Sequence, residues 1–570
     1  MNLKKFLIGA MPALMLASCA SDEPTVNNDR GEGGSTYAKI RLQLTTATRS
    51  GTVDYDDPTN SEDGFEIGQV YENTINDVTL VLATYDNVAG TYKPVATSTK
   101  GVVQPDANPS DQPAQNPVYT IMFQDEDIVN LHGQKVYVFA YCNSSVGEDD
   151  IMAASDLALM EGVINNPDRD DVWKSGGFLM VNAPNKGVPS VTLPAEEELI
   201  NDYNTPEKAL DLGVVNVSRV ASRFDFKQVN GNVYSIFNVN DASDKIAEIQ
   251  LLAMAPINIA KDFYYLPRVS EDGQTPWTVC GIERPDNWVV SPNYADKTPG
   301  NAMNLLSNYL YQAYGHNYGD ETYYSYTAMA AFDKMDDDND ENWGTNMQGG
   351  NAGYKIWRYV SENTLPSISG QVKGLSTGVV FKAEILNPKA ESNMAVAMEA
   401  KKAVYAYNGT YYGDVEALRA VVAKMPENST MRKDFEKVFG AESLIIDEDT
   451  KEFKNPISDC TPTANDGTFK ILRPTIGSDG AAHYYVYYVY YNRHNDNGVP
   501  TQMSTMEFAT VRNNIYKLAV TSISDFGHTS DPGDDPDPEN PGDPDEEPKT
   551  YFKVSCRVVP WMVRVNNIEF

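Results

Sequence analysis

The sequence predicts an all-β protein built from two β-sandwich domains. Short apolar stretches recur along the chain and alternate with clusters of Gly, Asn, Asp and Pro, the pattern of strands joined by turns. Tyr is abundant at 34 residues, against 19 Phe and 6 Trp, and aromatic residues favour strands. Helical spacing is weak except near Ile151–Val163 and in two short segments, Asp414–Met425 and Thr430–Phe439, which predict small helical insertions.

Length and charge restrict the class of protein. The chain has 570 residues, enough for two to four domains at roughly 150 residues each. Lys and Arg total 45 and Asp and Glu total 80, so the formal net charge is −35. Nucleic-acid binding and docking on anionic lipid through basic patches both need cationic surfaces, so we expect neither. The five Cys and five His are scattered without metal-ligand spacing, so we expect no metal and no cofactor.

Residues 1–19 form a predicted signal peptide. Two lysines at positions 4 and 5 precede an apolar stretch, Phe6–Leu16, that is too short to span a bilayer. The stretch ends in Leu-Ala-Ser-Cys at 16–19, which resembles the lipobox of bacterial lipoproteins. The resemblance implies export, cleavage before Cys19 and acylation of its thiol. An ordinary secretory signal with a chance cysteine is the alternative.

Residues 20–49 form a predicted propeptide that contains the first strand. Apolar and polar residues alternate strictly from 38 to 44, which predicts a half-buried strand. The apolar members of this strand are Ala38, Ile40, Leu42 and Leu44. A polar stretch rich in turn formers follows it, and Arg49 lies in that stretch.

The strand-like segments of the body fall into two predicted domains, 50–268 and 269–527. The segments in the first are 75–85, 134–143, 218–229 and 247–260. Those in the second are 377–387, 401–413, 483–492 and 506–523. A stretch rich in Pro, Gly and Trp, 269–300, separates the two sets and marks the expected boundary.

An acidic linker and two short strands end the chain. In the linker, 528–549, the stretch Asp531–Pro548 holds nine acidic residues and six prolines, so we expect it to be extended and to join neither sandwich. The last segment, 550–570, predicts two short strands separated by Pro560. Two strands cannot form a core alone, so they must pack on a sheet of their own body or of a neighbour. Their apolar residues are Phe552, Val554, Cys556, Val558, Trp561, Val563 and Val565.

Three motifs suggest chemistry, and none is convincing. Residues 374–378 match G-x-S-x-G, but a strand follows where a nucleophile elbow needs a helix, so a turn is expected. The acidic run Asp336–Glu341 lacks the Gly and Glu of an EF-hand loop, so a solvated loop is favoured over calcium binding. The tyrosines of 484–491 are typical of a central strand, with sugar stacking as the alternative. We expect no catalytic residues and no enzyme.

The order of these segments resembles the major fimbrial subunits of Bacteroidales, the fimbrillins of type V pili. The resemblance covers nearly the whole chain and is most specific at Val511–Ile523 and from the acidic linker to Phe570. The segment 216–226, NVSRVASRFDF, also resembles the N-terminal domain of the family. Within the family the chain is most similar to the stalk subunit of the short, or minor, fimbriae of Porphyromonas.

This resemblance implies a fold, a maturation route and a set of partners. It implies two transthyretin-like sandwich domains, an outer-membrane lipoprotein precursor acylated at Cys19, and a cut by an arginine-specific protease between Arg49 and Ser50. The strand 38–44 would then leave, and the C-terminal donor strand of the next subunit would fill its groove. Arg41 is a second possible cleavage site, but a cut there would split the strand.

The function expected from the resemblance is a structural stalk subunit of a cell-surface fimbrium. The subunit would polymerise head to tail with itself by donor-strand exchange and contribute to adhesion and biofilm formation. Its other expected partners are the anchor and tip subunits and host or bacterial surface receptors. Two alternatives stay open: a tip or anchor subunit of the same fimbria, and a surface lipoprotein that binds glycans through Tyr or Trp loops.

Overall fold

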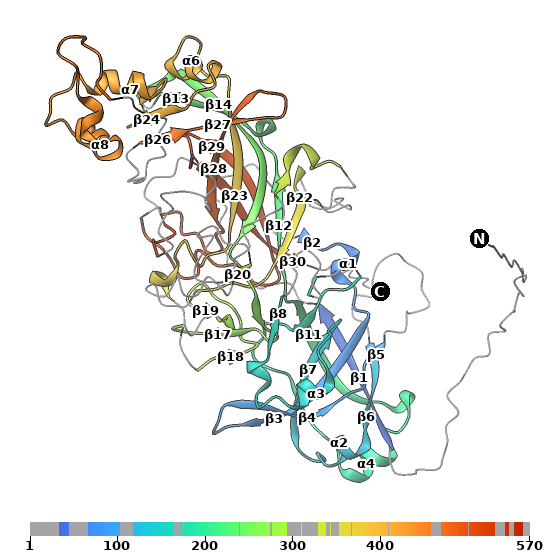
Figure 1. The fold of residues 1–570 in the computed structure, drawn as a ribbon. Coiled ribbons are helices and arrows are strands. Elements are labelled where there is room, and N and C mark those ends of the chain that lie inside the picture. Colours follow the sequence, from blue (N-terminus) through green and yellow to red (C-terminus); the bar gives the residue numbers. More distant parts are fainter. Residues whose placement is uncertain are drawn as a thin grey trace, which may run out of the picture.

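The chain is all-β, as the sequence predicts, with a few short helices among many strands. The computed structural model describes residues 34–44, 66–102, 118–164, 172–173, 176–238, 240–273, 276–292, 309–310, 329–337, 343, 353–365, 367–408, 410–455, 457, 469–499, 501–529, 542–546 and 552–562. Figure 1 shows an elongated molecule, with the earlier strands at its lower end and most of the later strands above them.

A nine-stranded sheet forms the lower end of the molecule in Figure 1. Its main path runs in the order β4-β3-β7-β9-β11-β1-β6, and β10 and β5 pair with β7 and β3 at its margins. The strands are β1 (Ser35–Leu44), β3 (Asp77–Asp86), β4 (Thr91–Thr97), β5 (Gly101–Val102), β6 (Val118–Gln124), β7 (Lys135–Cys142), β9 (Met180–Asn182), β10 (Ser190–Thr192) and β11 (Leu210–Arg219).

Two further sheets form the upper part. One has the order β2-β30-β29-β12-β22, and the other has the order β13-β14-β23-β28-β27, with β21 against β14. The first contains β2 (Glu66–Ile67), β12 (Ser222–Lys227), β22 (Lys355–Val360), β29 (Asn514–Ile523) and β30 (Phe552–Met562). The second contains β13 (Val233–Asn238), β14 (Asp241–Ile257), β21 (Ala330–Ala331), β23 (Gly378–Leu386), β27 (Pro474–Ile476) and β28 (Ala482–Tyr491).

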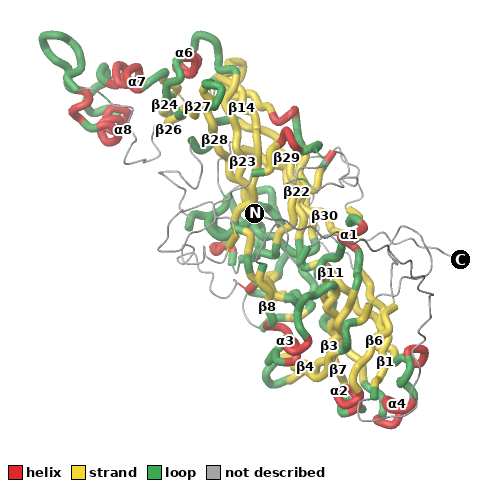
Figure 2. Tube along the Cα trace, turned by 45° about the vertical axis from the view of Figure 1, so that its right-hand side comes forward, coloured by secondary structure: helices red, strands yellow, loops and turns green. Residues whose placement is uncertain are grey.

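The shorter elements complete the described fold, and Figure 2 shows the helices at the ends and margins of the sheets. Small ladders are formed by β8 (Glu161–Val163) with β16 (Asp262–Tyr264), by β15 (Ile259–Ala260) with β20 (Tyr309–Leu310), and by β17 (Arg268–Ser270) with β18 (Thr278–Val279) and β19 (Trp288–Val289). The α-helices of the lower part are α1 (Val70–Asn73), α2 (Asp125–Val129), α3 (Glu148–Met152) and α4 (Glu196–Asn201).

Apolar side chains hold these layers together in two large clusters. One cluster belongs mainly to the nine-stranded sheet, and it also includes Ile515 of β29. The other takes residues from both upper sheets, for example Phe224 of β12 and Phe381 of β23, so these two sheets pack face to face. This is the arrangement of a β-sandwich, in which inward-facing side chains of two sheets interdigitate.

The change from the lower sheet to the upper ones comes earlier in the chain than expected. The expected boundary at 268–269 assigned 218–229 and 247–260 to the first domain. Instead β12 pairs with β22 and β29, and β14 pairs with β23, so the sheet changes between Arg219 and Ser222. Strand patterns in a sequence report which face is buried and not which distant strand is the partner, and this explains the difference.

A helical module lies at the upper end of the molecule (Figure 1). It contains β24 (Val404–Tyr407), β25 (Thr410–Tyr412), β26 (Lys470–Leu472), α7 (Val415–Val422) and α8 (Thr430–Phe439), and α6 (Asn393–Glu399) precedes it. The module has a hydrophobic cluster of its own, which includes Tyr405 and Phe435. Both helices begin as the sequence predicts, because Asp414 and Ser429 cap them through their side-chain oxygens.

Candidate assembly site

The predicted first strand lies in the interior of the nine-stranded sheet. β1 pairs antiparallel with β6, where Ala38 lies opposite Ile121, and parallel with β11, where Leu42 lies opposite Val215. Strands 118–124 and 210–219 come much later in the chain, so a short N-terminal strand closes a gap between two elements of the body. Without β1, the facing edges of β6 and β11 would each lose a hydrogen-bonding partner.

The burial of β1 follows the alternation of its sequence. Ala38, Ile40 and Leu42 have 0% exposed surface, and Leu44 is half-buried against the same cluster. Arg41 and Gln43 on the other face are exposed. The predicted strand is therefore confirmed, and it begins earlier than expected, at Ser35.

The predicted modification and cleavage sites lie outside the described residues. Cys19, Arg49 and Ser50 all belong to stretches that the structure does not describe, so lipidation and cleavage stay predictions. The next described elements along the chain are β2 and the short helix α1, and a buried ionic cluster holds α1 in place.

Glu72 of α1 is the centre of that ionic cluster. Its carboxylate accepts hydrogen bonds from Arg223 at 3.1 Å and 3.2 Å and from the Tyr359 hydroxyl at 2.6 Å. Arg219 donates to the carbonyl oxygen of Glu72 at 2.8 Å and to the side chain of Asn513 at 2.9 Å. Burial lowers the pKa of Arg219 to about 10. The cluster therefore ties the segment after the predicted cleavage site to β12, β22 and the turn before β29.

The C-terminal strand folds back on its own chain. β30 pairs antiparallel with β29 from Phe552 opposite Ile523 to Pro560 opposite Asn514, with an irregularity between Val520 and Ser522. Phe552 is 9% exposed, and its ring centroid lies 4.6 Å from that of Tyr488. The sequence leaves two alternatives for the terminal strand, a sheet of its own body or a sheet of a neighbour. In the structure, the strand pairs with a sheet of its own body.

The expectation of two short strands separated by Pro560 is wrong. One continuous strand passes through the proline. A proline is tolerated where its missing N–H does not face a ladder. Among the described residues, the second neighbour of β30 is β2, which pairs with Trp561 and Met562, beyond the proline. Val554 and Cys556 pack against the upper core beside Phe552, as their shared face predicts. Val558 and Trp561 are placed in the strand by their backbone alone, and Val563 and Val565 lie outside the described residues.

The expectation that the acidic linker joins neither sandwich is also wrong for its second half. Pro544 forms an isolated antiparallel bridge with Val372. The Lys373 amide donates to the Asp543 carbonyl oxygen at 3.0 Å, and the Asp545 amide donates to the Gln371 carbonyl oxygen at 3.2 Å. The prediction considered only like-charge repulsion and missing proline amides, whereas the body supplies partners for the remaining polar groups.

The G-x-S-x-G motif and the tyrosine run behave as the structural interpretation predicts. Ser376 is buried in the turn before β23, and its hydroxyl donates to Asp545 at 2.5 Å. In β28, which lies between β23 and β27, Tyr484 and Tyr488 are buried in the upper core, so the strand is central. Of the acidic run, Asp336 pairs with Lys355 at 3.0 Å, and residues 338–341 lie outside the described part.

The described residues show neither a metal-ligand cluster nor a membrane-spanning helix. They contain no group of three or more His, Cys, Asp or Glu side chains placed to hold a metal ion. No helix among them is long and apolar enough to cross a bilayer.

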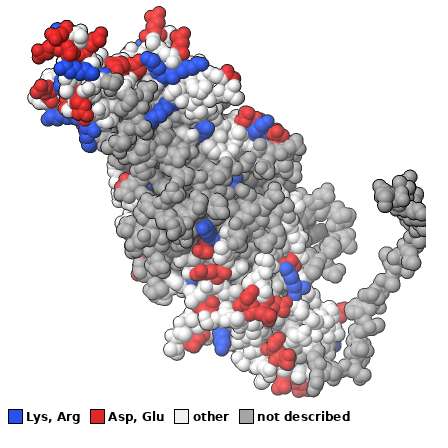
Figure 3. Space-filling model, viewed as in Figure 1, with Lys and Arg blue, Asp and Glu red and all other residues white. Residues whose placement is uncertain are grey.

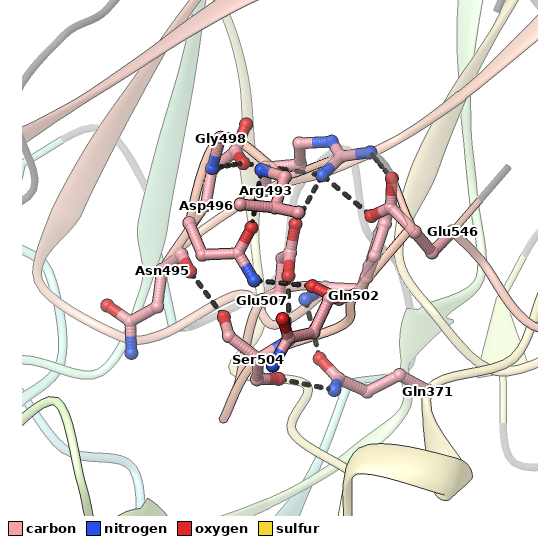
Figure 4. Close-up of polar contacts among 12 residues, drawn as sticks. Gln371, Arg493, Asn495, Asp496, Gly498, Gln502, Ser504, Glu507 and Glu546 are labelled. Carbon is pink, nitrogen blue, oxygen red and sulfur yellow. Dashed lines mark hydrogen bonds and ion pairs between the residues drawn. The ribbon is translucent and has the colours of Figure 1, made fainter. Parts of the chain in front are cut away.

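Sequence reasoning missed the buried charges around the strand ends. Arg493, after β28, donates to Glu546 at 3.0 Å and 3.3 Å and to the buried carboxylate of Glu507 (Figure 4). Burial raises the pKa of Glu507 to about 7, although the Ser504 amide and the charge of Arg493 act in the opposite direction. Arg512 pairs with Glu362 at 3.0 Å, and both side chains are buried. Arg512, inside the strand-like segment 506–523, was an available signal, but its partner Glu362 lies 150 residues away in the sequence.

The fold thus combines an upper β-sandwich, a first strand paired on both sides within the nine-stranded sheet, and a terminal strand paired with its own chain. Residues 483–567 match the family described as "Major fimbrial subunit protein type IV, Fimbrillin, C-terminal". The C-terminal region of the chain is thus similar to that of the fimbrillins, the major fimbrial subunit proteins. The matched region contains β28, β29 and β30, which meet in the upper sandwich.

Comparisons with other proteins give distant likenesses. A fimbrilin (FimA) from Porphyromonas gingivalis aligns over 93% of this chain and 99% of its own, with 11% identity and a TM-score of 0.33. The C-terminally truncated tip fimbrial protein Mfa3 of the same organism aligns over 92% of this chain and 100% of its own, with 7% identity and a TM-score of 0.32. No curated protein matches the sequence.

Proposed function

We propose that the chain is the stalk subunit of a type V fimbria and that it polymerises by donor-strand exchange after proteolysis. The observation that carries this proposal is the interior position of β1. The strand precedes Arg49, so a cut there leaves it attached to the body by non-covalent contacts alone. Ile40 and Leu42 are fully buried, and their burial contributes about 3–6 kcal/mol to holding the strand.

Departure of β1 would create a site for a strand of another subunit. The edges of β6 and β11 would be unpaired, and the apolar positions under Ala38, Ile40 and Leu42 would be exposed. A strand with alternating apolar residues can satisfy both needs. Because the donor and the groove are different parts of the subunit, repetition produces an open, head-to-tail filament.

The donor in this proposal lies within residues 550–570. In an unpolymerised subunit, residues Phe552–Pro560 of this segment pair with β29, as in the structure. Two apolar sets remain candidates for the inserted strand. The first is Phe552, Val554, Cys556 and Val558, and the second is Trp561, Val563 and Val565.

The maturation route completes the proposal. The precursor is an outer-membrane lipoprotein acylated at Cys19, and an arginine-specific protease cuts between Arg49 and Ser50. The mature subunit lies in a cell-surface fimbrium with anchor and tip subunits, and the fibre contributes to adhesion and biofilm formation through surface receptors. The fimbrillin match at 483–567 supports the fimbrium and the self-association.

The test compares Arg49→Ala with Arg41→Ala as a matched control. Purified precursor is treated with a trypsin-like protease and followed by N-terminal sequencing and electron microscopy. We expect wild-type and Arg41→Ala fibres that begin at Ser50, and no fibres from Arg49→Ala. Fibres whose subunits begin at Cys19 would exclude the proteolytic trigger.

A further inference from the structure

The second half of the acidic linker is held on loops of the upper sandwich by backbone and side-chain contacts. We call residues Asp543–Glu546 the clasp. Its backbone joins the loop before β23, and two of its three acidic side chains, Asp545 and Glu546, bind Ser376 and Arg493. Asp545 and Glu546 are both nearly buried, which is unusual for carboxylates in a linker of this composition.

The contacts of the clasp form a closed ring with loop residues of the upper part, and Figure 4 shows the members of the ring from Glu546 to Gln371. Arg493 binds Glu546 and Glu507, the Glu507 carboxylate accepts from the Ser504 amide at 2.8 Å, and the Ser504 carbonyl accepts from Gln371 at 2.8 Å. The Gln371 carbonyl in turn accepts from the Asp545 amide. Because each member positions the next, the clasp is a specific contact.

The same region touches the C-terminal strand. The thiol of Cys556 in β30 lies 3.4 Å from the Arg493 carbonyl oxygen and 3.8 Å from the side-chain oxygen of Asn492. The loop that binds Glu546 with its guanidinium therefore contacts β30 with its backbone. Clasp and strand are therefore both in contact with Arg493.

The number of residues between the clasp and β30 limits how far β30 can move from the body. From Glu546 to Phe552 there are six residues, which span at most about 20 Å when extended. Within the described part of the chain, the next backbone contact upstream is that of His528 with Tyr487, 24 residues before Phe552. With the clasp open, the linker could span about 80 Å. In addition to the ladder with β29, the clasp thus limits how far β30 can move from its own subunit.

We propose that the clasp is an autoinhibitory latch that holds the C-terminal strand on its own subunit until Asp545 and Glu546 are released. The latch rests on the proposed strand exchange for its biological use, but its physical claim concerns the monomer. Proteolysis of the propeptide opens the acceptor groove, and opening of the clasp supplies the donor. Assembly then requires two separate events at different places in the molecule.

The first test locks the latch with a disulfide. Val372 and Pro544 lie opposite each other in the bridge, so the double variant Val372→Cys/Pro544→Cys can be crosslinked, and peptide mass spectrometry verifies the bond. After propeptide cleavage, the oxidised form should remain monomeric, and reduction should restore fibre growth. The single variants Val372→Cys and Pro544→Cys are the controls. If the oxidised form grew fibres as fast as the reduced form, the latch would be overturned.

The second test uses the monomer and is independent of polymerisation. In the double variant Asp545→Ala/Glu546→Ala, the thiol of Cys556 should react with a maleimide at least about tenfold faster, because local opening controls access. Asp537→Ala/Glu539→Ala removes the same charge from the same linker and should leave the rate unchanged. Cys142 and Cys280 are buried elsewhere and report whether the fold is intact.

The two tests separate the latch from the proposed function. If no form polymerises after cleavage while Cys556 responds only to the clasp variant, strand exchange fails and the latch stands. If Cys556 reacts equally in both double variants, the latch is overturned, whatever the fibres do. If Cys142 and Cys280 also become reactive in the clasp variant, the disulfide-locked protein provides the test. Cys556 must then react more slowly in the protein with the 372–544 disulfide than in the same protein without it, and equal rates would refute the latch.

Discussion

Arg223 and Glu72 form an ion pair of 3.1 Å in which neither side chain has any exposed surface. The pair joins α1 to β12, and thereby joins the segment after the predicted cleavage site to the upper sandwich. Asp225 binds the other side of the same guanidinium at 2.8 Å. Arg223 is therefore compensated twice, which is what a fully buried cation requires.

Removal of this carboxylate should destabilise the chain strongly. Glu72→Ala leaves Arg223 with one partner fewer in a buried site, and we expect a loss of about 3–5 kcal/mol in the free energy of unfolding. Lys245→Ala is the control, because it breaks an exposed ion pair with Glu248 and should cost less than about 1 kcal/mol. Denaturant unfolding of the uncleaved protein measures both, and equal losses would contradict the role assigned to burial.

The first strand should contribute to the stability of the precursor through its buried face only. Ile40→Ala removes a fully buried side chain and should cost about 2–5 kcal/mol, whereas Gln43→Ala on the exposed face should change little. Thermal unfolding of the precursor checks this difference. A loss of similar size in both variants would show that β1 is held by its backbone alone.

Stability should rise as the pH falls from about 8 towards 5, in part through Glu507. Its pKa in the folded chain is about 7, above the ordinary value of 4.5, so the folded state binds a proton that the unfolded state has released in this range. Folding is therefore favoured by lower pH across this window. Unfolding at pH 8 and pH 5.5 should show a smaller pH effect in Glu507→Gln than in the wild type. An unchanged effect would assign the dependence to other groups.

The terminal strand should respond to substitutions according to its faces. Val554 packs against the upper core and Lys553 is exposed, so an unpaired carboxylate from Val554→Asp would cost several kcal/mol, and Lys553→Glu should be tolerated. We expect Val554→Asp to loosen β30 in hydrogen exchange and to abolish SDS-resistant ladders of the cleaved protein. Normal ladders from Val554→Asp, or from a chain that lacks 551–570, would refute donation by this segment.

The predicted lipid anchor can be tested by one substitution. Cys19→Ser should leave the precursor without a lipid and prevent it from reaching the outer surface, because a single thiol carries the acyl groups. Metabolic labelling with a fatty acid should mark the wild-type precursor and not the mature fibre. Equal incorporation of label into Cys19→Ser would contradict acylation at this residue.

The sequence predicted those features that depend on local pattern. The alternation of 38–44 identified the buried face of β1, and helical spacing identified α8 at Thr430–Phe439. Features that depend on distant partners were missed. Phe224 lies opposite Tyr516 in the upper sheet, and Ser376 binds Asp545 169 residues away. A one-dimensional pattern specifies which side chains seek burial, but the partner that covers them is chosen by the tertiary fold.

The helical module leaves and re-enters the fold through neighbouring strands, since Val404 lies opposite Leu472 and Tyr405 lies opposite Ile471. Its apolar residues form a cluster separate from that of the sandwich. A segment whose two ends are paired side by side can change in length or sequence without moving the strands beneath it. The outermost surface at this end can therefore diversify, or accept an engineered peptide, while the sheets that carry β1 and β30 keep their geometry.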